Sequence, residues 1–208
     1  MLLLLFAGRL FNMLRGSVHV SITAGFCISL AAALSILPAS WVGSWLLAIA
    51  VHEFSHCITI LLCGCKLQTV RLTSFGAEIT AHMNRCWQEI FCSLAGPVGG
   101  LTILLLHKLL PIAALCTLVL SAYNLLPLRN LDGGRALYAL LRTIFTQDQA
   151  NNFCILTDKT VRVFIFILAL FLSFRLQWFI PLAFSAVLLF PKKRRIKSTC
   201  KRKTLRVQ

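Results

Sequence analysis

The segment His52-Glu53-Phe54-Ser55-His56 holds the residues of this chain that are best suited to chemistry. Two histidines four residues apart lie on one face of an α-helix, where their imidazole nitrogens can bind the same zinc ion. The glutamate that follows the first histidine is placed to act as a base. This HExxH pattern predicts a zinc site with His52 and His56 as metal ligands and Glu53 as the catalytic base.

The alternative interpretation of the two histidines is a polar pair that is hydrogen-bonded between helices. That interpretation leaves Glu53 unexplained, because an acid among apolar neighbours is costly and usually has a function. The whole chain contains only six Asp and Glu residues. With so few acids, chance alone is unlikely to place one of them inside this motif. We therefore favour the zinc site.

The elements that must position these residues are predicted to be membrane helices. Of the 208 residues, 58% are hydrophobic and only 13% are charged, whereas soluble domains carry about 25% charged residues. This composition predicts an all-α polytopic membrane protein. We expect a single domain over residues 1–191, followed by a basic tail over residues 192–208.

Six apolar segments suggest about six transmembrane helices, and the HExxH motif lies inside the second of them. The last two segments are short for a hydrocarbon core that requires about 20 helical residues. The predicted spans cover residues 17–37, 41–64, 88–106, 111–127, 161–174 and 177–190.

Two of the connecting segments show a pattern of their own. Segment 68–82 places apolar residues on both sides of a Ser-Phe-Gly turn, which predicts a short β-hairpin near the membrane surface. Segment 135–145 has apolar residues at helical spacing, which predicts an amphipathic helix lying along the interface.

The distribution of basic residues predicts the orientation. If both termini face the cytoplasm, all of the 21 Lys and Arg residues except Lys108 and Arg175 lie on the inner side, as the positive-inside rule requires. We therefore expect a multi-pass protein of the bacterial cell membrane. The net charge of +15 then needs no nucleic acid as partner. The tail lacks the aromatic residues of a nucleic-acid site, and anionic lipid is its expected partner.

The nine cysteines are odd in number and lie mostly in or beside apolar segments. This pattern is not that of a secreted disulfide framework. Cys63-Gly64-Cys65 could be a thiolate metal site, but the chain has no second pair of this kind. Small buried hydrophobic residues are the better interpretation.

A catalytic zinc ion normally takes three protein ligands and leaves one position for water. Glu78 and Glu89 are acids of the usual kind, but neither lies in a supporting motif. Asp132 follows the inner end of the fourth predicted span, and two glycines after it permit a tight turn around the carboxylate. An Asp-Gly pair alone would indicate an ordinary turn. With HExxH at the same membrane face, we predict that Asp132 is the third ligand.

HEFSH followed by NLLPLRNLDGG resembles the site-2 protease family of intramembrane zinc metalloproteases. In that family a motif of the form N-x-x-P-x-x-x-L-D-G supplies the third zinc ligand, which here corresponds to Asp132. The resemblance implies that Asn124 contacts the substrate or the oxyanion. Gly96-Pro97 resembles the central Gly-Pro element of the family, so the resemblance covers about residues 41–135.

The small size and six-span layout look most like the sporulation branch of that family, typified by stage IV sporulation protein FB. This resemblance implies one zinc ion per chain, a membrane-associated pro-sigma factor as substrate, membrane regulatory proteins as partners, and action from the mother-cell side. The chain departs from the family at two places. It has Gly99-Gly100 where Asn is common, and Arg129-Asn130 where prolines are common.

The expected function is hydrolysis of a peptide bond in a membrane-tethered protein, with Glu53 taking a proton from the zinc-bound water. A zincin with a soluble catalytic domain would need a large polar region around HExxH, which the sequence lacks. The remaining alternative is a non-proteolytic metal-binding membrane protein, either a transporter or a pseudoprotease scaffold. Buried His, Glu and Asp would serve a transporter too, whereas a scaffold would not need Glu53.

Overall fold

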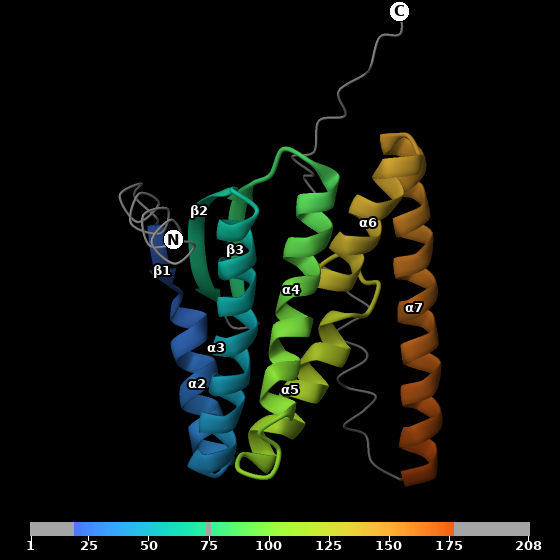
Figure 1. The fold of residues 1–208 in the computed structure, drawn as a ribbon. Coiled ribbons are helices and arrows are strands. Elements are labelled where there is room, and N and C mark those ends of the chain that lie inside the picture. The colour runs from blue at the N-terminus through green and yellow to red at the C-terminus, as the bar shows by residue number, and fades with distance from the viewer. Residues whose placement is uncertain (1–18, 74–75, 177–208) are drawn as a thin grey trace, which may run out of the picture.

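The computed structural model describes residues 19–73 and 76–176, and these residues form six helices and three strands (Figure 1). In chain order they are β1 (His19–Ile22), α2 (Ala24–Ile36), α3 (Ala39–Leu62), β2 (Lys66–Thr73), β3 (Gly76–His82), α4 (Cys86–Leu104), α5 (Pro111–Asn124), α6 (Asp132–Ile144) and α7 (Gln147–Leu176).

Helix α4 is the centre of the helical part. It packs against α3, α5 and α6, while α5 also packs against α3 and α7 packs on α6. Helices α2 to α5 and α7 run roughly alongside one another, and the shorter α6 continues above the end of α5 (Figure 1). Proline opens α5 at its first position, where the missing backbone N–H has no partner in the helix anyway. This arrangement brings the middle of α3 close to the start of α6.

The predicted hairpin is present and forms part of a three-stranded sheet in the order β1-β2-β3. Strands β2 and β3 are antiparallel, and Gly76 begins β3 with a φ of +119°, a conformation that favours glycine. Strand β1 is parallel to β2, pairing His19 with Thr69 and Ile22 with Leu72. The sheet lies beside the C-terminal half of α3 (Figure 1).

Strand β1 corrects the prediction that one span covers residues 17–37. Residues 19–22 are extended, and helix α2 begins only at Ala24. The Thr23 hydroxyl caps α2 by accepting a hydrogen bond from the Phe26 amide at 3.4 Å, and it donates one to the Leu72 carbonyl at 3.0 Å. The change from strand to helix therefore depends on contact with a strand about 50 residues away, which hydropathy does not detect.

The other predicted spans agree with the helices to different degrees. Within the described residues, α3 alone is both long and apolar enough to cross a membrane, and α2 and α5 are apolar but shorter. Helix α7 begins at Gln147, well before the predicted span 161–174. The predicted span 177–190 and the tail 192–208 lie outside the described residues, so the number of spans stays a prediction.

Many large apolar side chains are exposed on the helices. Soluble proteins rarely expose large contiguous apolar patches, whereas membrane helices present apolar side chains to lipid. The exposed residues on α2, α3, α4, α5 and α7 include Ile28, Leu34, Phe54, Phe91, Leu115, Phe164, Leu170 and Phe174. The fold is therefore mostly helical with a small sheet, and exposed apolar helix faces of this kind are those expected of a membrane protein.

Two buried clusters hold the elements around the centre of the fold. One contains Ile60, Cys65, Met83 and Cys92 and joins α3 to the sheet and to α4. The other joins α6 to α7 and includes Tyr138, Leu141, Ala150 and Cys154. In both clusters the cysteines are buried among apolar side chains with free thiols, as expected for small hydrophobic residues.

Candidate metal centre

Helix α3 places the two histidines of the HExxH segment side by side in the interior. His52 and His56 are only 3% and 8% exposed, and their Nε2 atoms lie 3.2 Å apart. The imidazole rings meet edge to face, with centroids 4.8 Å apart. The four-residue spacing therefore directs both Nε2 atoms to one point beside α3.

Asp132 reaches the same point from the other half of the chain. It is the first residue of α6, and its Oδ2 atom lies 3.1 Å from Nε2 of both His52 and His56. Within residues 19–73 and 76–176, this trio is the one group of potential ligands that could hold a metal ion. Glu78 and Glu89, the other acids considered as third ligand, are not part of it.

The spacing of these three atoms fits a zinc ion. Zinc binds imidazole nitrogen and carboxylate oxygen at about 2.0–2.2 Å, usually in tetrahedral geometry. Two ligands at that distance and angle are about 3.3–3.6 Å apart. The observed separations of 3.1 to 3.2 Å are therefore close to those that a shared metal ion requires.

The protonation of His56 also favours a cation at this point. Its Nδ1 atom lies 2.6 Å from the Cys92 carbonyl oxygen, and because a carbonyl only accepts, Nδ1 carries the hydrogen. In a neutral imidazole the Nε2 atom then has a lone pair, which faces the Asp132 carboxylate. Two acceptors at this distance repel unless a second proton or a metal ion lies between them. The bond to Cys92 would orient the ligand from behind.

Asp132 has the charge that a metal ligand needs. Burial raises the pKa of its carboxyl group, but protonated imidazoles beside it, which donate hydrogen bonds and carry positive charge, lower that pKa to about 2 overall. A metal cation at the same point would act in the same direction. The side chain is thus an anion at neutral pH, and a carboxylate must be deprotonated to bind a metal.

Glycines of α4 allow the metal centre to form against a helix backbone. A Cβ atom on Gly96 would lie 2.2 Å from Nε2 of His56 and 2.6 Å from Nε2 of His52. One turn further on, a Cβ atom on Gly99 would lie 1.9 Å from Oγ of Ser55. Gly99 stands near the point where the resembled family often has Asn, and the sequence offered no reason for glycine there. The reason is the close packing of α3 on α4.

The glycines after Asp132 have a different role from the one predicted. Among the described glycines only Gly64 and Gly76 have positive φ, so Gly133 and Gly134 do not form a left-handed turn. They lie in the first turn of α6, where added Cβ atoms would meet the carbonyl oxygens of Leu125 and Leu128 at 2.1 and 2.0 Å. Glycine is needed there because the preceding loop packs directly on α6.

Glu53 lies beside the ligand trio but is not part of it. It follows His52 and so projects about 100° around the helix from that ligand. Its half-buried carboxylate faces the sheet, and its Oε1 atom accepts a hydrogen bond from the Ala77 amide at 3.4 Å. This contact places the predicted base between α3 and the start of β3.

Asn124 is the last residue of α5, and its side-chain amide donates to the Leu120 carbonyl within the same helix at 3.1 Å.

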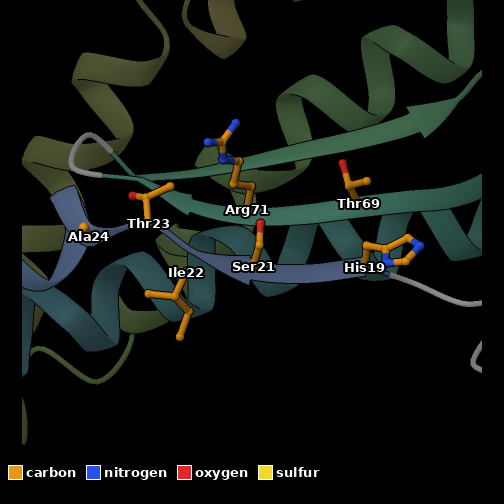
Figure 2. Close-up of a pocket in the computed structure, with 7 residues that line it drawn as sticks. All are labelled: His19, Ser21, Ile22, Thr23, Ala24, Thr69 and Arg71. Carbon is orange, nitrogen blue, oxygen red and sulfur yellow. The ribbon is translucent and has the colours of Figure 1, made fainter.

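A surface cavity of about 530 Å³ lies elsewhere, on β1 and β2, where its lining includes His19, Ser21 and Arg71 (Figure 2). None of the three ligands lines that cavity.

Comparison with known proteins shows which proteins this chain is similar to. No family model matches the chain. The structure superposes on the site-2 protease from Methanocaldococcus jannaschii with a TM-score of 0.60 and 18% identity, covering 86% of this chain and 94% of that one. The chain therefore has a site-2-protease-like fold.

A curated relative comes from Synechocystis sp. and bears the name "Putative zinc metalloprotease". It is 28% identical over 110 residues, which cover 45% of this chain. The alignment spans 29% of the length of that relative.

Proposed function

We propose that this protein is an intramembrane zinc metalloprotease of the site-2 type, which hydrolyses a peptide bond in a membrane-tethered protein. The observation that carries the proposal is the convergence of two buried imidazoles and one carboxylate within 3.2 Å, with a second carboxylate beside them. The fold of the archaeal protease and the name of the cyanobacterial relative support it.

Three residues would hold one zinc ion per chain: His52, His56 and Asp132. The ion, when bound, would supply a Lewis acid and lower the pKa of water to about 7. Glu53 would then accept the proton of the attacking water and deliver it to the leaving amine. Between these two proton transfers, the hydrogen bond from the Ala77 amide would hold the Glu53 carboxylate beside β3.

Cleavage tests this assignment directly. The full chain is co-expressed with candidate membrane-tethered transcription-factor precursors, and the products are read by gel. We expect Glu53→Gln to abolish cleavage while zinc binding persists, because glutamine cannot take the proton. Phe54→Leu, a change at the exposed neighbouring position, is the matched control and should cleave normally. Cleavage by Glu53→Gln would overturn the mechanism, and zinc binding without cleavage by the wild type would favour a scaffold.

The free edge of β3 is a suitable place for the substrate. The sheet order leaves this edge unpaired in the described part of the chain, and the Ala77 amide points from it toward Glu53. Amides two residues apart point the same way along a strand, so Ile79 and Ala81 offer the same edge. An extended substrate segment added there would pass the base.

Crosslinking tests this substrate path. A photoreactive residue at Thr80 on β3 should capture the substrate, and one at Val20 on the far strand β1 should not. Both positions are exposed, so access to the reagent is matched. Substrate capture at Val20 and not at Thr80 would exclude the path along β3.

Asn124 is proposed to stabilise the oxyanion after its amide leaves the Leu120 carbonyl. Removing one oxyanion donor typically lowers kcat by about 100-fold or more. We expect Asn124→Ala to show such a loss with unchanged zinc binding. Asn130→Ala, at an exposed position in the following loop, is the control, and an unchanged kcat for Asn124→Ala would exclude the role.

The proposed location is the bacterial cell membrane, with several spans and both termini in the cytoplasm. The resemblance to the sporulation branch suggests a pro-sigma factor as substrate and membrane proteins as regulators. Fusing a reporter that is active only in the cytoplasm to each terminus tests the orientation. An inactive reporter at either end would contradict an even number of spans with cytoplasmic termini.

A further inference from the structure

Helix α7 carries a buried ion pair outside the metal centre. Asp158 and Arg162 are each 8% exposed. The Arg162 guanidinium donates from Nε to Oδ2 of Asp158 at 2.8 Å and from Nη2 to Oδ1 at 3.0 Å. Such bidentate pairs are geometrically specific. Burying two charges is expensive, so a pair of this kind is weak evidence for stability and suggests a positional role.

The same carboxylate holds the loop that leads to the metal centre. Oδ1 of Asp158 accepts a hydrogen bond from the backbone amide of Arg129 at 2.9 Å. The Arg129 side chain is held as well, because its Nη2 atom donates to Oδ1 of Asn151 at 3.0 Å. Two positions on α7, separated by about two helical turns, therefore hold a single loop residue three positions before Asp132.

The loop behaves as one unit with the first turn of α6. Its backbone is folded on itself by bonds from the Leu128 amide to Leu126 and from the Leu131 amide to Leu128, at 2.7 and 2.9 Å. Leu128 is 1% exposed, and Gly134 of α6 lies directly against its carbonyl oxygen. A shift at Arg129 would therefore be passed to Asp132.

We propose that Asp158 is a positioning residue for the third metal ligand. Arg162 orients its carboxylate, the carboxylate fixes the Arg129 amide, and the loop then holds Asp132 Oδ2 at 3.1 Å from both imidazoles. The proposal rests on the proposed function in one respect only, that the trio binds zinc.

An ion pair that only stabilised α7 would make the same contacts within that helix. Zinc binding would then be unaffected by loss of the hydrogen bond from the Arg129 amide to Asp158. Two double variants separate the roles. Asp158→Asn/Arg162→Gln removes both charges and keeps an oxygen that can accept from Arg129. Asp158→Arg/Arg162→Asp keeps an ion pair on α7 and removes that acceptor.

Zinc affinity of the full-length protein in detergent is the measurement, by competition with a chromophoric chelator. The absorption spectrum of the cobalt-substituted form reports the ligand geometry. Changes in such supporting contacts lower metal affinity by about 10- to 100-fold, and we expect this loss for Asp158→Ala. The matched control is Asp148→Ala, which removes an exposed acid from the first turn of the same helix and should bind zinc normally.

The double variants complete the test. Asp158→Asn/Arg162→Gln should bind zinc nearly as the wild type does, whereas the charge-swapped variant should resemble Asp158→Ala and show an altered cobalt spectrum. Normal zinc affinity in a folded Asp158→Ala protein would overturn the proposal. Restored affinity in the charge-swapped variant would do so too. If Asp158→Ala does not fold, the two double variants still decide.

These measurements use no substrate. Loss of zinc affinity in Asp158→Ala would therefore stand even if the wild-type protein cleaved nothing, which would refute only the protease assignment. Conversely, cleavage that depends on Glu53 together with unaltered zinc binding in Asp158→Ala would refute only the positioning role.

Discussion

At the scale of single residues, Gly96 sets how closely helix α4 approaches the metal centre. Any side chain there would enter the space of both imidazoles, since its Cβ atom would lie 2.2 Å from His56 Nε2. Both imidazoles are buried, and His56 is held from behind by the Cys92 carbonyl. The rings therefore have little freedom to move away from an added methyl group.

We expect Gly96→Ala to weaken zinc binding by about tenfold or more, the range seen when ligand orientation is disturbed. The measurement is zinc affinity by chelator competition, with helical content followed by circular dichroism. Gly43→Ala is the control, because a Cβ atom at Gly43 has no atom within 4 Å. Equal zinc affinity in the two variants would show that the imidazoles can yield to the methyl group.

At the scale of the elements, the contact between α3 and α4 depends on small residues facing each other. A Cβ atom on Gly99 would overlap both Oγ and Cβ of Ser55, at 1.9 and 2.3 Å, but it would keep an ordinary 3.7 Å distance from Ser55 Cα. The overlap thus involves only the Ser55 side chain. Small residues allow membrane helices to pack closely in this way.

Gly99→Ala is therefore expected to destabilise the fold by about 1–3 kcal/mol, as overpacking does. Adding Ser55→Gly should recover much of this loss, since both overlapping atoms are then absent. Unfolding in denaturing detergent measures each variant, and Ser55→Gly alone corrects for the glycine in α3. A double variant that is as unstable as Gly99→Ala would mean that the overlap with Ser55 is not the cause of the destabilisation, and that the added methyl group meets another part of α3.

The ion pair of α7 shows how an element can serve a site that it does not line. Asp158 contributes no metal ligand, but it holds the backbone of the loop from which α6 begins. A helix pattern indicates that residues 158 and 162 share a face. It does not indicate that the partner on that face is a loop amide.

At the scale of the whole molecule, the metal centre joins two halves of the chain. The histidines belong to α3 and the aspartate to α6, and both helices pack on α4. A ligand that binds only the folded state stabilises it by about 2.7 kcal/mol at 100 times its Kd. Zinc bound here would therefore stabilise the contact of both helices with α4.

Removal of zinc by a chelator should accordingly lower the unfolding temperature of the wild-type protein. Glu53→Gln should show the same shift, because Glu53 is not a ligand, whereas Asp132→Ala should show little or none. Thermal unfolding with and without added zinc measures the effect. A full zinc-dependent shift in Asp132→Ala would remove Asp132 from the ligand set.

The sequence alone determined the features that depend on local spacing. The four-residue interval put His52 and His56 on one face of a helix, and alternation around a glycine turn indicated the hairpin of β2 and β3. Apolar spacing indicated α6 close to its observed bounds. These features follow from the periods of helix and strand, which are properties of short segments.

The tertiary structure decided the features that depend on distant contacts. Strand β1 exists because it pairs with β2, and Gly99 is required because α3 lies against it. The sequence motif had already indicated Asp132 as the third ligand, but the fold decides how it meets His52 across 80 residues of chain, and Asp158 holds the loop that brings it there. The repeat of a helix or strand along a short segment does not predict contacts between residues so far apart in the chain. Packing of the helices on α4 brings the separate segments together, and that packing forms the metal centre.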